Sequence, residues 1–374
     1  MKKYLSFLST VIVILTGCDK TSPMTGYIND NGADITELRV NLDSFSSTVS
    51  TKAAGSTADN EKLIHNVQVF IFRKGGAQDG LLDAARYVSL SSPVSGSYNM
   101  DPLKCTVGER QCMVIVNAPQ DYTSSISSLA ELQAKTFTLA DCVTGSTQKL
   151  VMVGTRMEKN SQEVTKFEPG ELSVTVKVSR LVSAVNLTKV INKMQVPALQ
   201  SKVKFTGAYL MNVAGLQNYA GTLKASVSTA IPDANWYAKN KKASGSEPAF
   251  LLLQAPASAQ SIAYGDTGIT PGYLMYSLPS DIGGAVGTDE RVEGDGTGFR
   301  TSTYLIVEAT VDDKACVYPI LLPQLEANKK YNVTLTINHM GGDPTKPWEK
   351  IKFTDFSANI NVVDWTNVEY NETI

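Results

Sequence analysis

The sequence predicts an all-β protein built from two tandem β-sandwich domains, with a few short helices. Two observations support this fold class. Short segments that alternate apolar and polar residues recur along the chain, and glycine and proline separate them. In addition, 43% of the 374 residues are apolar, enough for one large or two medium hydrophobic cores. We expect an N-terminal sandwich over residues 53–179 and a C-terminal one over residues 180–374.

Residues 1–17 have the pattern of a lipoprotein signal peptide. Lys2 and Lys3 supply its positive start, and the apolar run from Leu5 to Leu15 is too short to span a bilayer. The sequence Leu15-Thr16-Gly17-Cys18 then matches a bacterial lipobox, so we expect lipid on Cys18 and anchoring in the outer membrane. The alternative is an ordinary signal peptide followed by a chance cysteine.

Residues 18–52 are expected to contain one strand. In it Leu38, Val40 and Leu42 alternate with polar residues and give the strand one apolar face. The following segment, Ser44 to Ala58, is mostly Ser, Thr, Ala and Gly, which indicates an accessible loop. Its single basic residue makes the Lys52–Ala53 bond the candidate protease cleavage site.

The rest of the N-terminal domain shows one strongly apolar strand and several weaker elements. The segment Leu63–Phe72 is apolar on both faces, as a central strand between layers would be. Further predicted elements are strands at 113–116, 149–153 and 172–178 and a short helix at 127–134.

The second half of the chain shows the same succession of predicted strands. Strands are predicted at 181–190, 203–213, 273–278, 302–311, 317–322 and 331–337. The alternation of apolar residues changes phase at Val362 and Val363, which predicts a β-bulge there. In the terminal segment Thr366–Ile374, Val368 and Tyr370 again alternate with polar residues.

The sequence offers no chemistry typical of an enzyme. It contains no nucleophile elbow, P-loop, zinc-protease or dinucleotide-binding motif, and we expect no catalytic residue, cofactor or metal. A net charge of −2 also argues against nucleic-acid binding. Cys105 and Cys112 flank a candidate hairpin turn, where they could form a disulfide or remain buried thiols.

Several segments resemble the Bacteroidales fimbrillin family, the FimA class of type V pilins. They are the lipobox and the segments 61–70, 104–118, 178–184, 318–321, 328–333 and 361–365. The resemblance implies two transthyretin-like sandwiches in a surface lipoprotein precursor. It further implies that residues 18–52 form a propeptide whose strand, with Leu38, Val40 and Leu42, is removable. A trypsin-like protease would remove the leader together with this first strand, and a strand from the C-terminal region of a neighbouring subunit would replace it.

The resemblance leaves three roles open. The family commonly has arginine before the cleavage site, whereas this chain has Lys52. A shaft-type fimbrial subunit needs both the removable strand and a donor such as the segment with Val368 and Tyr370. A tip adhesin needs only the groove, and an uncleaved glycan-binding lipoprotein needs neither. Expected partners are other copies of the chain, other fimbrial subunits, the maturation protease and a host or bacterial surface receptor.

Overall fold

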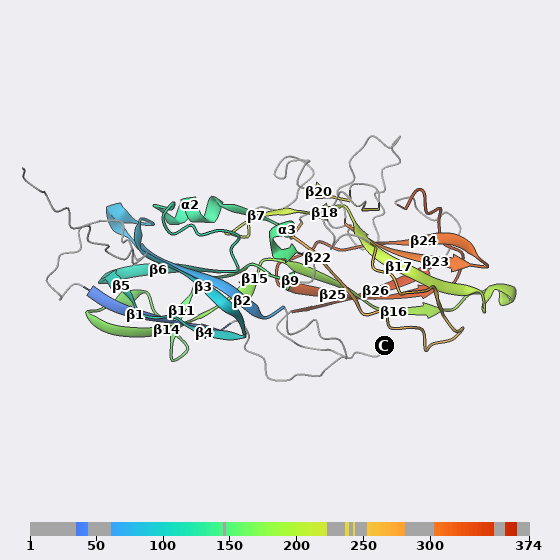
Figure 1. Ribbon diagram of the computed structural model, residues 1–374, viewed down its shortest axis with the longest axis horizontal. Helices are drawn as coiled ribbons and strands as arrows, with labels where there is room; N and C mark the ends of the chain where they lie inside the picture. Colours follow the sequence, from blue (N-terminus) through green and yellow to red (C-terminus); the bar gives the residue numbers. More distant parts are fainter. Residues whose placement is uncertain are drawn as a thin grey trace, which may run out of the picture.

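The structure is a computed structural model that describes residues 35–43, 61–144, 147–222, 236–238, 242–243, 253–280, 303–347 and 356–364. Within these residues the fold is all-β, and two sandwiches lie end to end along the long axis (Figure 1). None of the described helices is long and apolar enough to cross a membrane.

The first sheet of the N-terminal sandwich has the earliest described strand, β1, at its centre (Figure 1). β1 pairs in parallel with one neighbour, β14, and antiparallel with the short strands β4 and β5. In spatial order the strands are β12 (Gln162–Glu163), β11 (Met157–Lys159), β14 (Gly170–Lys177), β1 (Ile35–Asp43) and β4 (Ser97–Asn99), with β5 (Leu103–Thr106) also on β1.

The second sheet of this sandwich is centred on the apolar segment that the sequence predicts as a central strand. Its order is β15 (Ser179–Arg180), β10 (Met152–Gly154), β6 (Gly108–Val116), β2 (Leu63–Arg73) and β3 (Leu82–Ser95), with β13 (Lys166–Phe167) also on β6. β2 is apolar on both faces because it packs against two layers. Val67 and Val69 face the first sheet, whereas Phe70 and Phe72 belong to the core on the other side.

The C-terminal sandwich consists of two four-stranded sheets. One has the order β22 (Tyr273–Ser277), β16 (Ser183–Asn192), β25 (Lys329–Ile337) and β26 (Phe356–Asp364). The other has the order β21 (Gln260–Ser261), β17 (Val203–Met211), β23 (Tyr304–Val311) and β24 (Lys314–Leu321). The only parallel pair among these strands is β16 with β25.

Short elements connect the two sandwiches. β7 (Thr136–Thr138) of the N-terminal part pairs with β19 (Leu216–Asn218) of the C-terminal part. Around this pair the ring of Tyr219 stacks on Phe137 and contacts Tyr122 edge-on. One buried apolar cluster therefore runs from Phe70 through this junction into the C-terminal core. The remaining short elements are α2 (Leu129–Ala134), α3 (Leu139–Cys142), β8 (Val143–Thr144), β9 (Thr147–Gln148), β18 (Val213–Ala214), β20 (Trp236–Tyr237) and the 3₁₀ turns Gly76–Gln78 and Pro197–Leu199.

The all-β prediction and the predicted strands are confirmed, although several ends differ by a few residues. The predicted helix at 127–134 is confirmed as α2, which begins after Ser128 because that hydroxyl accepts a hydrogen bond from the Glu131 amide. The bulge predicted at Val362 and Val363 is wrong, because β26 pairs with β25 without a shift from Phe356 to Asp364. β26 is the outer strand of its sheet and Val362 is 45% exposed, so apolar residues on both faces do not require a bulge there.

Candidate functional site

The site to which the sequence points is the region around β1. Both edges of this strand are paired along their length. On one side the register runs in parallel from Thr36 opposite Gly170 to Asp43 opposite Lys177. On the other side β5 covers the first half of β1 and β4 covers the second half. Removal of β1 would therefore open a slot in the middle of the sheet, with an unpaired strand edge on each side.

The three apolar side chains predicted to face inward lie in the core. Leu38, Val40 and Leu42 are 0%, 2% and 1% exposed, whereas Arg39 between them is exposed. Across the interior they belong to the same cluster as residues of the second sheet, including Val67 and Val114. Transfer of each such side chain from water into the core contributes roughly 1.5–3 kcal/mol.

Polar contacts secure β1 at several points. The hydroxyl of Thr36, which is fully buried, donates to the carbonyl oxygen of Glu168 at 2.6 Å. The side-chain amide of Asn41 donates to Ser173 Oγ at 3.1 Å. The amide of Met100, between β4 and β5, donates to the carbonyl oxygen of Val40 at 3.0 Å. The strand is thus bound by the backbone and side-chain contacts of an ordinary central strand.

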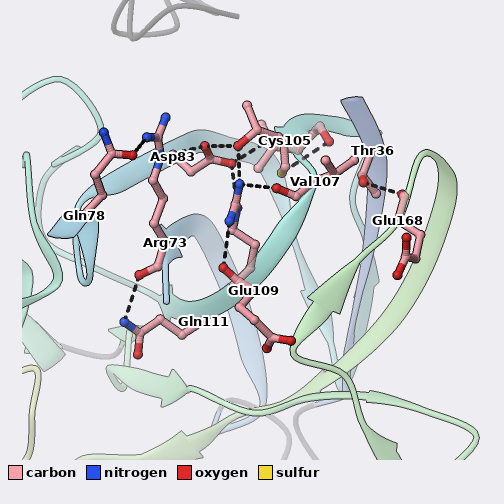
Figure 2. A network of polar contacts seen from close by, with 12 residues as sticks. Thr36, Arg73, Gln78, Asp83, Cys105, Val107, Glu109, Gln111 and Glu168 are labelled. Carbon is pink, nitrogen blue, oxygen red and sulfur yellow. Dashed lines mark hydrogen bonds and ion pairs between the residues drawn. The ribbon is translucent and has the colours of Figure 1, made fainter. Parts of the chain in front are cut away.

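A buried ionic cluster lies beside the start of β1. Its centre is Asp83 of β3, whose side chain is 1% exposed and lies 3.2 Å from Arg110 Nε and 3.5 Å from Arg73 Nε. The same carboxylate accepts hydrogen bonds from the amide and hydroxyl of Thr106, at 2.9 and 2.6 Å. Figure 2 shows Asp83 close to Cys105, with Thr36 of β1 beside that cysteine. Spacing along the chain gave no sign of this cluster, because its members come from four separate segments.

Cys105 and Cys112 are both buried and form no disulfide, and the hairpin predicted between them is wrong. They lie in opposite sheets: Cys105 on β5 pairs with Thr36 of β1, and Cys112 on β6 pairs with Ile71 of β2. Their thiols approach different backbone carbonyl oxygens, those of Leu103 and Thr155. Of the two alternatives open from the sequence, the structure has the buried thiols. Burial raises the pKa of the Cys112 thiol to about 12.

A second polar cluster ties the junction of the two sandwiches to the segment that precedes β2. The guanidinium of Arg180 donates through Nε and Nη2 to the carbonyl oxygen of Glu61, at 3.3 and 3.2 Å. The hydroxyl of Tyr276, from the C-terminal sandwich, donates to Glu61 Oε1 at 2.9 Å. Burial lowers the pKa of Arg180 to about 10 despite the nearby Glu61 carboxylate. Glu61 is the first described residue after the candidate cleavage loop, so the chain is fixed to both sandwiches immediately beyond it.

The other predicted site residues lie outside the described residues. They are the lipidation site Cys18, the cleavage site Lys52 and Ala53, and the donor candidates Val368 and Tyr370. Within the described residues, no three His, Cys, Asp or Glu side chains gather as a metal site would require.

The arrangement defines a class of protein: two linked β-sandwiches, the first closed by a strand from near the start of the chain. Residues 36–176 match the family model of the major fimbrial subunit protein (FimA), a structural subunit. The resemblance to fimbrillins is thereby confirmed for this part of the chain, which includes β1 and most of the strands of the first sandwich.

Solved structures share the fold over most of the chain. A fimbrilin from Porphyromonas gingivalis W83 is 13% identical with a TM-score of 0.56, covering 91% of this chain and all of its own length. A candidate cell adhesion protein from Parabacteroides distasonis is 14% identical, with a TM-score of 0.55 over 91% of this chain and 99% of that one. Another, from Bacteroides eggerthii, is 17% identical, with a TM-score of 0.54 over 89% and 97% of the two chains. A search of curated proteins gave no match.

Proposed function

We propose that this chain is the precursor of a fimbrial subunit that polymerises by strand exchange and supports adhesion at the cell surface. In this proposal β1 is a temporary strand. A trypsin-like protease cuts at Lys52–Ala53, β1 leaves with the leader, and a strand from another copy takes its place. The observation that carries the proposal is the position of β1, a fully paired central strand whose next described residue, Glu61, lies beyond the candidate cleavage loop.

The energetics of β1 favour exchange over permanent loss. Leu38, Val40 and Leu42 are almost completely buried, so an empty slot would expose an apolar trough and two unpaired strand edges. Such a trough is a template for the addition of a strand from another chain. The terminal segment with Val368 and Tyr370 offers alternating apolar side chains for this purpose. Because donor and acceptor are different surfaces, the contact is head-to-tail and generates a filament.

The export route in this proposal rests on the first eighteen residues. A lipid on Cys18 would hold the uncut precursor in the outer membrane, and the cut at Lys52 would release the subunit from that anchor. An uncut copy would keep its lipid and stay at the base of the fibre. The match of residues 36–176 to the major fimbrial subunit family supports a fimbrial role for the released subunit.

The test is to treat the purified full chain briefly with trypsin. The chain carries Cys18→Ser, which prevents lipidation. We expect a new N-terminus at Ala53, filaments in electron micrographs, and neither after Lys52→Ala. Arg39→Ala is the matched control, because Arg39 is also basic and exposed but lies within a paired strand. A second variant, with Val368→Asp and Tyr370→Asp, should be cut normally but form no filaments.

Other outcomes would assign a different role. A chain that is cut at Ala53 but forms no filaments, with or without the aspartate substitutions, would contradict the shaft role and favour a tip subunit. A chain that resists trypsin as a monomer would contradict exchange altogether and favour an uncleaved surface lipoprotein.

A further inference from the structure

Strand β5 depends on β1 for its place in the sheet. Among the described strands its only ladder partner is β1, with Thr36 opposite Cys105 and Leu38 opposite Leu103. Once β1 has left, no strand would hold β5 by backbone pairing. An incoming strand nevertheless needs this edge, since β5 forms one wall of the slot over the first half of β1. Something other than a strand must keep it in position.

The end of β5 is held by Asp83 of the opposite sheet. Asp83 Oδ2 accepts from the Thr106 amide at 2.9 Å, and Oδ1 accepts from the Thr106 hydroxyl at 2.6 Å. The register of β3 with β2 shifts at this point: Ala84 pairs with Ile71 while Leu82 pairs with Phe72. Asp83 is therefore the extra residue of a β-bulge, a feature that re-aims a side chain relative to its neighbours. Here the side chain reaches across to β5.

Arg110 completes this first clamp. Its Nε lies 3.2 Å from Asp83 Oδ2, and its Nη2 donates to the carbonyl oxygen of Val107 at 2.7 Å and also to the Thr106 hydroxyl. Two guanidinium groups, from Arg110 and Arg73, compensate the buried charge of Asp83. Position 108 favours glycine because its φ is +114°, and an added Cβ would also lie 3.2 Å from Arg110 Nη1.

A second clamp from β3 holds the beginning of β5. Arg86 Nη1 donates to the carbonyl oxygen of Pro102, the residue directly before β5, at 2.9 Å. Its Nη2 lies 3.3 Å from a carboxylate oxygen of Asp101. Asp101 is 85% exposed, so water screens that pair and the contact to the Pro102 carbonyl is the one that fixes the backbone. None of these contacts involves an atom of β1.

We propose that Asp83 and Arg86 are positioning residues that hold β5 as a preformed wall of the slot while β1 is absent. This inference rests on the strand exchange proposed above. A wall that stays in place spares the incoming strand the cost of ordering it, which raises affinity without any new contact to that strand. The clamps should therefore affect strand binding more than they affect the uncut precursor, in which β1 itself also holds β5.

The test uses the full chain carrying Cys18→Ser, with Val368→Asp and Tyr370→Asp so that the cut chain does not polymerise. It is cut with trypsin and freed from the released segment by gel filtration after the protease is inhibited. The probe is a fluorescent peptide with the sequence of residues 35–43, and its dissociation constant is measured by anisotropy. Thr106→Val removes the hydroxyl bond to Asp83, and Arg86→Met removes the bond to Pro102. Thr106→Ser keeps the hydroxyl, and Lys159→Met changes an exposed residue of β11, which does not border the slot.

We expect Thr106→Val and Arg86→Met each to weaken peptide binding by about tenfold, since each removes a hydrogen bond to a charged group. Thr106→Ser and Lys159→Met should bind as the parent does. The urea midpoint of each uncut variant shows that it folds and measures its effect while β1 is in place. Hydrogen exchange at the β5 amides of the cut chain should be faster in the two clamp variants alone.

Equal peptide affinity and equal β5 exchange in the clamp variants and the parent would overturn the clamp proposal and leave strand exchange intact. A weakening of binding that only matches the stability loss of the uncut chain would also overturn it. If the cut parent binds no peptide at all, the proposed exchange fails, and the clamp proposal fails with it.

Discussion

Replacement of Leu38 by alanine tests whether β1 is part of the core. Leu38 is 0% exposed and lies in the cluster between the two sheets of the first sandwich. Removal of a fully buried leucine side chain costs about 2–5 kcal/mol, the transfer term plus the cavity that remains. We therefore expect Leu38→Ala to lower the free energy of unfolding of the uncut chain by about this amount, measured by urea denaturation.

The same substitution has a different consequence after cleavage. Once the Lys52–Ala53 bond is cut, residue 38 no longer belongs to the chain that refolds, so the variant and the parent should have the same unfolding curve after the segment is removed. A peptide of residues 35–43 with alanine at 38 should bind the slot at least 30-fold less tightly, which corresponds to about 2 kcal/mol. The contribution of the Leu38 side chain thus appears as folding stability in the uncut chain and as binding affinity between two chains after the cut.

Arg39→Ala is the control, since Arg39 is exposed on the same strand and its replacement should change stability by less than about 0.5 kcal/mol. If Leu38→Ala proves as harmless as Arg39→Ala in the uncut chain, β1 does not contribute to the core. Loss of β1 would then leave no apolar slot behind, and the proposed exchange would be refuted whatever the trypsin experiment shows.

Three further results are expected, all by urea denaturation. Stability should fall as the pH rises above 9, by roughly 1 kcal/mol per pH unit for each buried thiol. The reason is that Cys112 and Cys142 ionise near pH 9 when unfolded but have pKa values of about 12 when folded. Cys142→Ala should reduce this slope, and an unchanged slope would contradict the prediction. Gly154→Ala should destabilise the first sandwich by about 1–3 kcal/mol, since its Cβ would lie 2.6 Å from the Lys177 carbonyl oxygen; wild-type stability would show that the backbone yields. Tyr276→Phe should lower the free energy of unfolding by about 1–3 kcal/mol, because it removes the hydrogen bond from the Tyr276 hydroxyl to Glu61 Oε1. A loss of stability below about 0.5 kcal/mol, the level of an ordinary surface substitution, would mean that this bond does not secure the junction.

The strands could be predicted from the sequence because alternation of apolar residues reports which face of a strand is buried. For β1 this was enough to identify Leu38, Val40 and Leu42 as core residues. Alternation does not reveal which strands are neighbours. β1 pairs with β14, more than a hundred residues away, and a parallel pair cannot be recognised from a connecting turn.

The error at Cys105 and Cys112 has a specific cause. A turn-like segment between two strands favours a hairpin, and the positive φ of Gly108 is typical of such a turn. Here the chain instead crosses from one sheet to the other, and the cysteines pair with Thr36 and Ile71 respectively. The charged groups around Asp83 that stabilise this crossing come from β2, β3 and β6, so no local sequence pattern indicates them.

The two sandwiches share a strand order that bears on the proposed exchange of β1. In the first, β1 lies between β14, in parallel, and β4 with β5; in the second, β16 lies between β25, in parallel, and β22. β2, β3, β6 and β10 likewise correspond to β17, β21, β23 and β24. β1 and β16 are thus equivalent central strands.

The two strands differ in how they are connected to the rest of the chain. β16 follows the first sandwich directly after β15 and precedes β17, so the chain holds it at both ends and no single cut can free it. β1 lies at the N-terminal side of everything else that the structure describes, and one cut in residues 44–60 separates it from β2. The same central position, stabilised by the same kind of contacts, is therefore held at both chain ends in one domain, and in our proposal it is replaceable in the other. Of the two described sandwiches, a single cut would therefore separate the central strand only from the first, as the proposed exchange requires.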